Sequence, residues 1–108
     1  MKANGKNIRI SPKKLSVVAE IIRGMDASEA LHFLKFAPKK GAGLLYKVLA
    51  SAVANAVNND GQKTESLYVS TLMVQKGIVY KRGNPVSRGR MHPILKRTSN
   101  VILELQVK

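Results

Sequence analysis

The most chemically distinctive segment of this 108-residue sequence is a cationic run close to its C-terminal end. Between Lys81 and Arg97 there are six Lys and Arg side chains and no Asp or Glu. A guanidinium group holds phosphate through two parallel hydrogen bonds or stacks on an unpaired base, and an ammonium group attracts phosphate as a point charge. These residue types therefore predict a polyanionic partner, which we interpret as nucleic acid.

Within this run, each residue type has an expected role. Arginines supply directional contacts, lysines supply general attraction, glycines let the backbone approach RNA closely, and hydroxyl groups bond phosphate or ribose. Gly83 and Gly89 are also ordinary turn residues, which is the competing interpretation for them. The expected contact set is Lys81, Arg82, Gly83, Arg88, Gly89, Arg90, Lys96, Arg97, Thr98 and Ser99.

A second and weaker set of cations lies outside the run. Two lysine pairs stand at the starts of expected helices, where the helix macrodipole disfavours positive charge, and this position favours a phosphate partner. Simple exposure to solvent is the competing interpretation. The set is Lys2, Lys6, Arg9, Lys13, Lys14, Arg23, Lys39 and Lys40.

The charge of the whole chain supports the same interpretation. Nineteen Lys and Arg against six acids give a net charge of +13, and no acid lies between Glu65 and Glu104. Such self-repulsion is best tolerated when a polyanion neutralises it. A membrane-active protein would instead need an amphipathic helix with a basic polar face, whereas these cations concentrate on an expected β-hairpin.

The sequence contains no arrangement that predicts catalysis or metal binding. The acids are scattered, no Ser or Thr stands beside an evident His base, and His32 and His92 lack cysteine or spaced carboxylate partners. We expect no enzyme activity, cofactor or small-molecule substrate. Zero cysteine, no signal-like N-terminal segment and no apolar run near the roughly 20 residues of a membrane span predict a cytoplasmic protein without a membrane partner.

The first elements that position the cationic run are a strand and a helix. Residues 5–10 are compatible with a short strand. Ser11 is a favoured N-cap and Pro12 a favoured first helical residue, so a helix is expected from there to Arg23. Gly24 then stands where glycine commonly ends a helix.

Two further helices are expected. Asp26 and Glu29 resemble a capping box that opens the second helix, and Pro38 ends it. The third and longest helix is expected over about 39–58, because its apolar residues recur at helical spacing. That stripe contains Leu45, Leu49, Ala52 and Ala56.

Two antiparallel strands are expected after the break at Asn59, Asp60 and Gly61. In the first, one face carries Leu67, Val69, Thr71 and Met73. In the second, the apolar residues Val101, Leu103, Leu105 and Val107 alternate with more polar ones. This alternation is typical of a half-buried strand.

The spacing of these strands predicts a long hairpin. If Leu67 pairs near Val107, the centre falls near Ser87 and each arm has about 15 to 20 residues, or about 50 to 65 Å at roughly 3.3 Å per residue. A compact body of this length has a radius of gyration of only about 13 Å. The tip is therefore expected to project from the body.

A two-stranded ribbon standing alone is marginally stable in water. We therefore predict that residues 76–100 are mobile in the free protein and become ordered on a partner. Backbone NMR relaxation of the free protein checks this, with larger-amplitude motion expected there than in the third helix. Equal rigidity in the two segments would refute the prediction.

Several short motifs together resemble a known family. Arg23 and Gly24 follow an apolar helix, Lys39 and Lys40 open the third helix, and an Ala-Val-Ala-Asn-Ala sequence occupies 52–56. Gly89-Arg90 and the Ile-Leu-Lys-Arg-Thr-Ser sequence at 94–99 complete the pattern. Over almost its whole length the chain resembles the bacterial large-subunit ribosomal protein twenty-two family. It departs from the family at 85–87, Met91 and Asn100, where Pro-Arg-Ala, Ala and His are usual.

The resemblance implies an α+β fold in which three helices pack on a small three-stranded antiparallel sheet and a long β-hairpin protrudes. One domain is expected over 1–108, with a globular body at about 1–75 and 100–108 and the hairpin at about 76–99. The implied role is structural, within the large ribosomal subunit.

For this role the implied partners are 23S rRNA, whose domains the protein bridges during assembly, and neighbouring ribosomal proteins. The hairpin tip is expected in the wall of the peptide exit tunnel, where the nascent peptide passes. An architectural DNA-binding protein with a basic β-ribbon is the alternative function.

Overall fold

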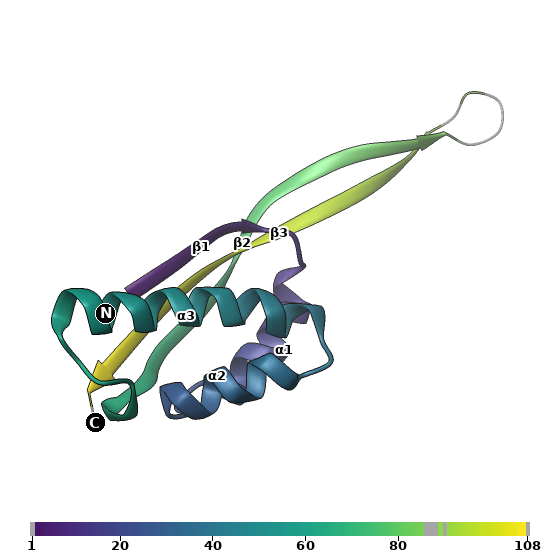
Figure 1. Cartoon of the computed structure of the whole chain (residues 1–108). Coiled ribbons are helices and arrows are strands. Elements are labelled where there is room, and N and C mark those ends of the chain that lie inside the picture. Colours follow the sequence, from purple (N-terminus) through teal and green to yellow (C-terminus); the bar gives the residue numbers. More distant parts are fainter. Residues whose placement is uncertain (1, 86–88, 90, 108) are drawn as a thin grey trace.

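Three helices cover one face of a three-stranded antiparallel sheet in the computed structural model, which describes residues 2–85, 89 and 91–107 (Figure 1). The strand order is β1-β3-β2, so the C-terminal strand is central. This arrangement confirms the expected α+β class. The elements are β1 (Lys2–Ile8), α1 (Pro12–Ile22), α2 (Ala27–Phe36), α3 (Lys40–Asp60), a short 3-10 turn η1 (Thr64–Ser66), β2 (Leu67–Pro85) and β3 (Met91–Val107).

The helix ends follow the local chemistry of the chain. The Ser11 hydroxyl accepts a hydrogen bond from the Lys14 N–H at 3.4 Å and begins α1. Gly24 and Gly61 adopt φ values of +86° and +67° after α1 and α3, where a side chain would be strained. Asp26 is the N-cap residue of α2, but its side chain makes no capping hydrogen bond, so the expected capping box is wrong.

The segment between α1 and α2 ties the helices to the sheet. The Gly24 N–H donates to the Val69 carbonyl at 3.0 Å, and the Val69 N–H donates to the Met25 carbonyl at 2.9 Å. These two bonds pair the interhelical segment with β2 as a strand would. The helical layer is therefore held by backbone hydrogen bonds as well as by apolar packing.

The core lies between the helices and the covered face of the sheet. Leu15 and Ile22 of α1, Leu34 of α2, and Leu45 and Leu49 of α3 are buried at the spacing that the helical period predicts. Against them the sheet buries Leu67, Val69, Leu72, Val101, Leu103 and Leu105. The alternation expected in the last strand is confirmed at 101, 103 and 105, whereas Val107 is exposed.

In β2 a bulge interrupts the expected alternation. Val69 pairs with Leu105 and Thr71 with Glu104, so Ser70 is the extra residue and its hydroxyl donates to the Glu104 carbonyl at 3.0 Å. Beyond the bulge, each residue of β2 points to the opposite face of the sheet from the one that unbroken alternation would give it. Leu72 is consequently buried and Met73 is exposed, which corrects the expectation that Met73 continues the face of Val69.

The first strand also differs from its expected limits, since β1 occupies Lys2–Ile8 and not residues 5–10. Its pairing with β3 shifts between Gly5 and Ile8, where Asn7 adopts φ +54°. The Asn7 N–H donates to the Asn100 side-chain carbonyl at 3.0 Å. The asparagine at position 100 thus supports an irregular turn of the backbone in β1.

Beyond the body the sheet continues as a two-stranded ribbon. Pairing between β2 and β3 runs from Leu67↔Val107 to Pro85↔Met91, while β1 reaches only Ile8↔Ser99. Figure 1 shows β2 and β3 extending well past β1 and the helices. The radius of gyration is accordingly 16.8 Å, with extents of 62 × 25 × 17 Å, against about 13 Å for a compact domain.

At the base of the ribbon, Gly77 lies directly against Thr98. A Cβ atom at Gly77 would stand 2.6 Å from the Thr98 hydroxyl oxygen and 3.2 Å from the Thr98 backbone. The Thr98 hydroxyl donates to the Ile78 carbonyl at 2.6 Å, so it is held in place. The β2–β3 register shifts between Lys76 and Val79, around this contact.

We expect Gly77→Ala to destabilise the fold by about 1–3 kcal/mol, because the added methyl must displace a hydrogen-bonded side chain and backbone. Urea unfolding measures the change. The matched control is Gly43→Ala in α3, where a Cβ meets nothing within 4 Å and alanine should stabilise the helix by about 0.5–1 kcal/mol. Equal effects at both positions would contradict the proposed tight contact.

Candidate nucleic-acid interface

The described cations of the outer ribbon occupy both of its faces. In the β2–β3 register, Lys81 lies opposite Leu95, Arg97 opposite Val79, and Lys96 opposite Tyr80. Opposed residues share a face and neighbours along a strand alternate, so Lys81 and Arg97 lie on one face and Lys96 on the other. All three side chains are exposed. The ribbon therefore presents positive charge in two opposite directions.

The other expected contacts in the hairpin are described to different extents. The backbone of Arg82 pairs with Ile94 in the ribbon, and Gly83 pairs with Pro93 and is exposed. Gly89 is exposed and adopts φ +71°, so its backbone conformation already favours glycine. Arg88 and Arg90 lie outside the described residues.

Thr98 and Ser99 are fully buried, which corrects the expectation that their hydroxyls contact RNA. The Thr98 hydroxyl donates to the Ile78 carbonyl, and the Ser99 hydroxyl donates to the Ile10 carbonyl at 2.7 Å. Both groups satisfy backbone acceptors where the ribbon leaves the body. We therefore assign them a structural role and leave them out of the candidate interface.

Arg23 also takes part in the fold. Its guanidinium group donates to the Leu72 carbonyl through Nη2 at 2.7 Å and Nε at 3.3 Å, although the side chain stays exposed. On the outer strand, Lys2 faces Glu104 across the β1–β3 pairing. An acid so close lowers the positive potential that Lys2 offers to a polyanion. Lys6, Arg9 and Lys13 are exposed.

The structure brings three of the weaker candidates together. Lys14 near the start of α1 and Lys39 and Lys40 at the start of α3 line one hollow of about 290 Å³, which we call the cationic hollow. Ile10, Val17, Val18 and Gly41 complete its walls. The sequence places each lysine at the start of a helix, but it does not indicate that the two helix starts meet.

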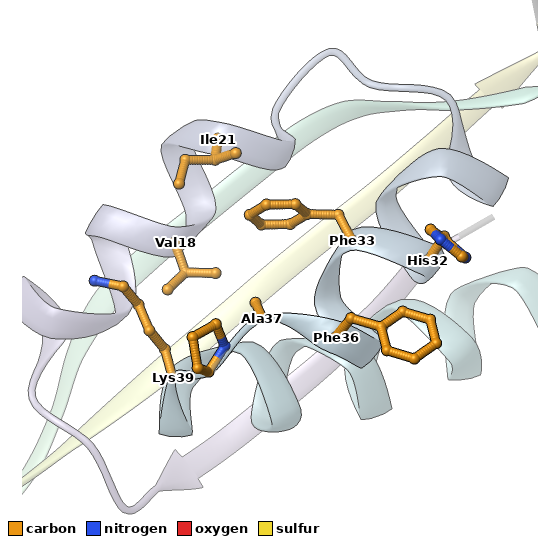
Figure 2. A pocket seen from close by; sticks show the side chains of 8 residues that line it. Val18, Ile21, His32, Phe33, Phe36, Ala37 and Lys39 are labelled. Carbon is orange, nitrogen blue, oxygen red and sulfur yellow. The ribbon is translucent and has the colours of Figure 1, made fainter.

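A neighbouring apolar feature was missed in the sequence. Val18 and Ile21 of α1 face Phe33 of α2 at a groove of about 460 Å³, and Phe36 also lines this groove, with its ring directed away from α1 (Figure 2). We call it the aromatic groove. The sequence does contain an indication of this groove, because Phe33 and Phe36 fall outside the buried stripe of α2, which contains Ala27, Ala30 and Leu34. Large apolar residues outside such a stripe indicate an apolar surface.

Over residues 2–85, 89 and 91–107, no group of three or more His, Asp or Glu residues is placed to hold a metal ion. Within the same residues, no helix combines the length and the apolar character that crossing a membrane requires.

Comparison with known proteins gives the family. The sequence profile of the family described as ribosomal protein L22p/L17e matches residues 3–106. The chain belongs to this family. A relative in Finegoldia magna, named large ribosomal subunit protein uL22, is 49% identical over 100 residues, covering 93% of this chain and 89% of the relative.

Other relatives of the same name extend this likeness to further organisms. The one in Petrotoga mobilis is 48% identical over 103 residues, covering 95% of this chain and 69% of the relative. The one in Ligilactobacillus salivarius is 46% identical over 107 residues, covering 99% of this chain and 93% of the relative. The similarity therefore spans both the helical body and the cationic ribbon.

We expect Ser99→Ala to lower stability by about 1 kcal/mol, because the partly buried Ile10 carbonyl loses its hydrogen-bond donor, and to leave the affinity for RNA unchanged. Urea unfolding and filter binding to a large-subunit RNA fragment measure the two effects. Lys96→Ala is the matched comparison in the same strand. Because Lys96 is exposed, we expect this variant to lose affinity for RNA and to keep its stability. A loss of RNA affinity in folded Ser99→Ala would restore Ser99 to the interface.

Proposed function

We propose that this chain is a structural, non-enzymatic constituent of the large ribosomal subunit, located in the ribosome, with large-subunit rRNA and neighbouring ribosomal proteins as partners. Its membership of the L22p/L17e family supports this assignment. The structural observation that carries it is the ribbon, which projects from the body and has exposed cations on both faces.

Cations on both faces support a bridging role in particular. A protein that lies on one RNA surface needs positive charge on one side only. Lys81 and Arg97 face one way and Lys96 the other, so RNA on either side of the ribbon would meet a cation. Each neutralised phosphate releases condensed counterions, which favours inserting the ribbon between RNA segments.

The finer proposal is that the hairpin tip lies in the wall of the peptide exit tunnel, beside the nascent peptide. The resemblance of the tip motifs to the family implies this position. The ribbon's reach beyond the body is compatible with it, because a body held at the subunit surface would still place residues near position 85 in the interior. In this arrangement Arg82, Arg88 and Arg90 contact tunnel-wall RNA.

Ultraviolet crosslinking in cells tests the proposed function, with the RNA nucleotides and the attached peptides both mapped. Crosslinks from 81–97 to large-subunit RNA near the tunnel are expected. Crosslinks confined to the body would refute the insertion of the ribbon. Crosslinks to duplex DNA, or to unrelated RNA only, would refute the ribosomal assignment and favour an architectural nucleic-acid binder.

We expect Lys96→Gln with Arg97→Gln to weaken RNA binding and subunit reconstitution more than Lys2→Gln with Lys6→Gln, although both pairs remove two charges. The slope of log affinity against log salt should fall by up to about 1.4 to 1.8 for the ribbon pair, if both cations contact phosphate. Lys2 faces Glu104, so the body pair should change the slope less. Equal changes in this slope for the two pairs would indicate that the cations act only by general electrostatic attraction.

A further inference from the structure

The aromatic groove and the cationic hollow adjoin each other on the helical face, and we call the two together the trough. Val18 and Lys39 line both of them, so the two hollows are direct neighbours. One end is apolar, with Phe33 and Phe36, and the other is cationic, with Lys14 and Lys40. All described residues that line the trough belong to α1, α2, the start of α3 or the segments beside these helices, and none belongs to β2 or β3.

The apolar end of the trough exposes large hydrophobic side chains to solvent. Phe36 is 67% exposed and Ile21 is 48% exposed, on facing helices. The His32 ring lies 5.0 Å from the Phe36 ring at an angle of 60°, and the Lys35 ammonium lies 5.8 Å from the centre of the Phe36 ring. An exposed aromatic ring with a cation and a second ring beside it is the arrangement on which unpaired bases stack.

The cationic end has the opposite character. Lys39 is the N-cap residue of α3, and no side chain caps that helix start. The first N–H groups of α3 thus add their partial positive charge to Lys14, Lys39 and Lys40. Among the described residues, those that line the two hollows include no Asp or Glu. The trough is therefore complementary to a ligand that is flat and apolar at one end and anionic at the other.

We propose that this trough binds a single-stranded segment of RNA, with an unpaired base in the aromatic groove and a neighbouring phosphate in the cationic hollow. This inference rests on the proposed function, since it identifies an additional RNA contact on the body. The groove volume of about 460 Å³ falls within the range of sites that bind small ligands. A basic protein segment is disfavoured by the surrounding lysines.

Photocrosslinking in assembled subunits identifies the occupant. Phe36 is replaced by the photoreactive residue p-benzoylphenylalanine, in cells whose only copy of the protein is this variant, and large subunits are isolated before irradiation. Crosslinks to a defined unpaired rRNA segment are expected. The control carries the same photoreactive residue in place of Val57, an exposed apolar residue of α3, and should not crosslink to that segment.

The remaining outcomes of this experiment are also informative. Crosslinks from position 36 to a neighbouring protein, or none at all, would overturn the inference. Neither outcome would affect the proposed function as long as the protein is present in the subunit. Absence of both the unmodified chain and the variants from large subunits would overturn the proposed function itself.

A binding measurement separates stacking from general attraction. The purified full-length protein is titrated with a short unstructured RNA that carries 2-aminopurine, whose fluorescence falls when the base stacks. Phe36→Leu keeps an apolar side chain but removes the ring, so the affinity should fall about 5- to 100-fold and the quenching should disappear. Phe36→Tyr should keep both. Unchanged quenching in Phe36→Leu would overturn the proposal.

Discussion

The hydrogen bonding of β3 to both of its neighbours is the interaction on which the rest of the structure depends. Its inner half pairs with β1 and β2 and buries Val101, Leu103 and Leu105 against the helices. Its outer half pairs with β2 alone and carries Lys96 and Arg97. One continuous strand thus joins the apolar core to the cationic ribbon, so the ribbon gains from the body an anchorage that two strands lack in water.

This division between an apolar body and a cationic ribbon also affects how the positive charge of the chain is distributed. A net charge of +13 on 108 residues disfavours compaction through self-repulsion, and the structure places Lys81, Lys96 and Arg97 on the ribbon, away from the core. The core itself contains small and branched apolar residues, with many alanines where helices and sheet approach closely. The apolar packing that stabilises the fold therefore lies in the body. The outer ribbon contributes exposed positive charge and length.

Much of this arrangement could be predicted from the sequence, because helical periodicity, caps and strand alternation act locally. The three helices followed from such signals, and the assumption that Leu67 pairs near Val107 agrees with the observed register. The bulge at Ser70 and the burial of Ser99 could not be predicted, since both depend on partners distant in the chain, Glu104 and Ile10. The cationic hollow was missed for the same reason, because the starts of α1 and α3 meet only in the folded molecule.

The contact between Gly77 and Thr98 has a mechanical consequence for the ribbon. The nine residues from Gly77 to Pro85 span about 26 Å, at roughly 3.3 Å for each step from one residue to the next. Across that length, a rotation of about 10° at the base moves the far end of β2 by about 5 Å, which exceeds the length of a hydrogen bond. Gly77 has no side chain and Thr98 is held by its hydroxyl, so their close packing fixes the direction of the ribbon at its base and thereby the position of the far end of β2.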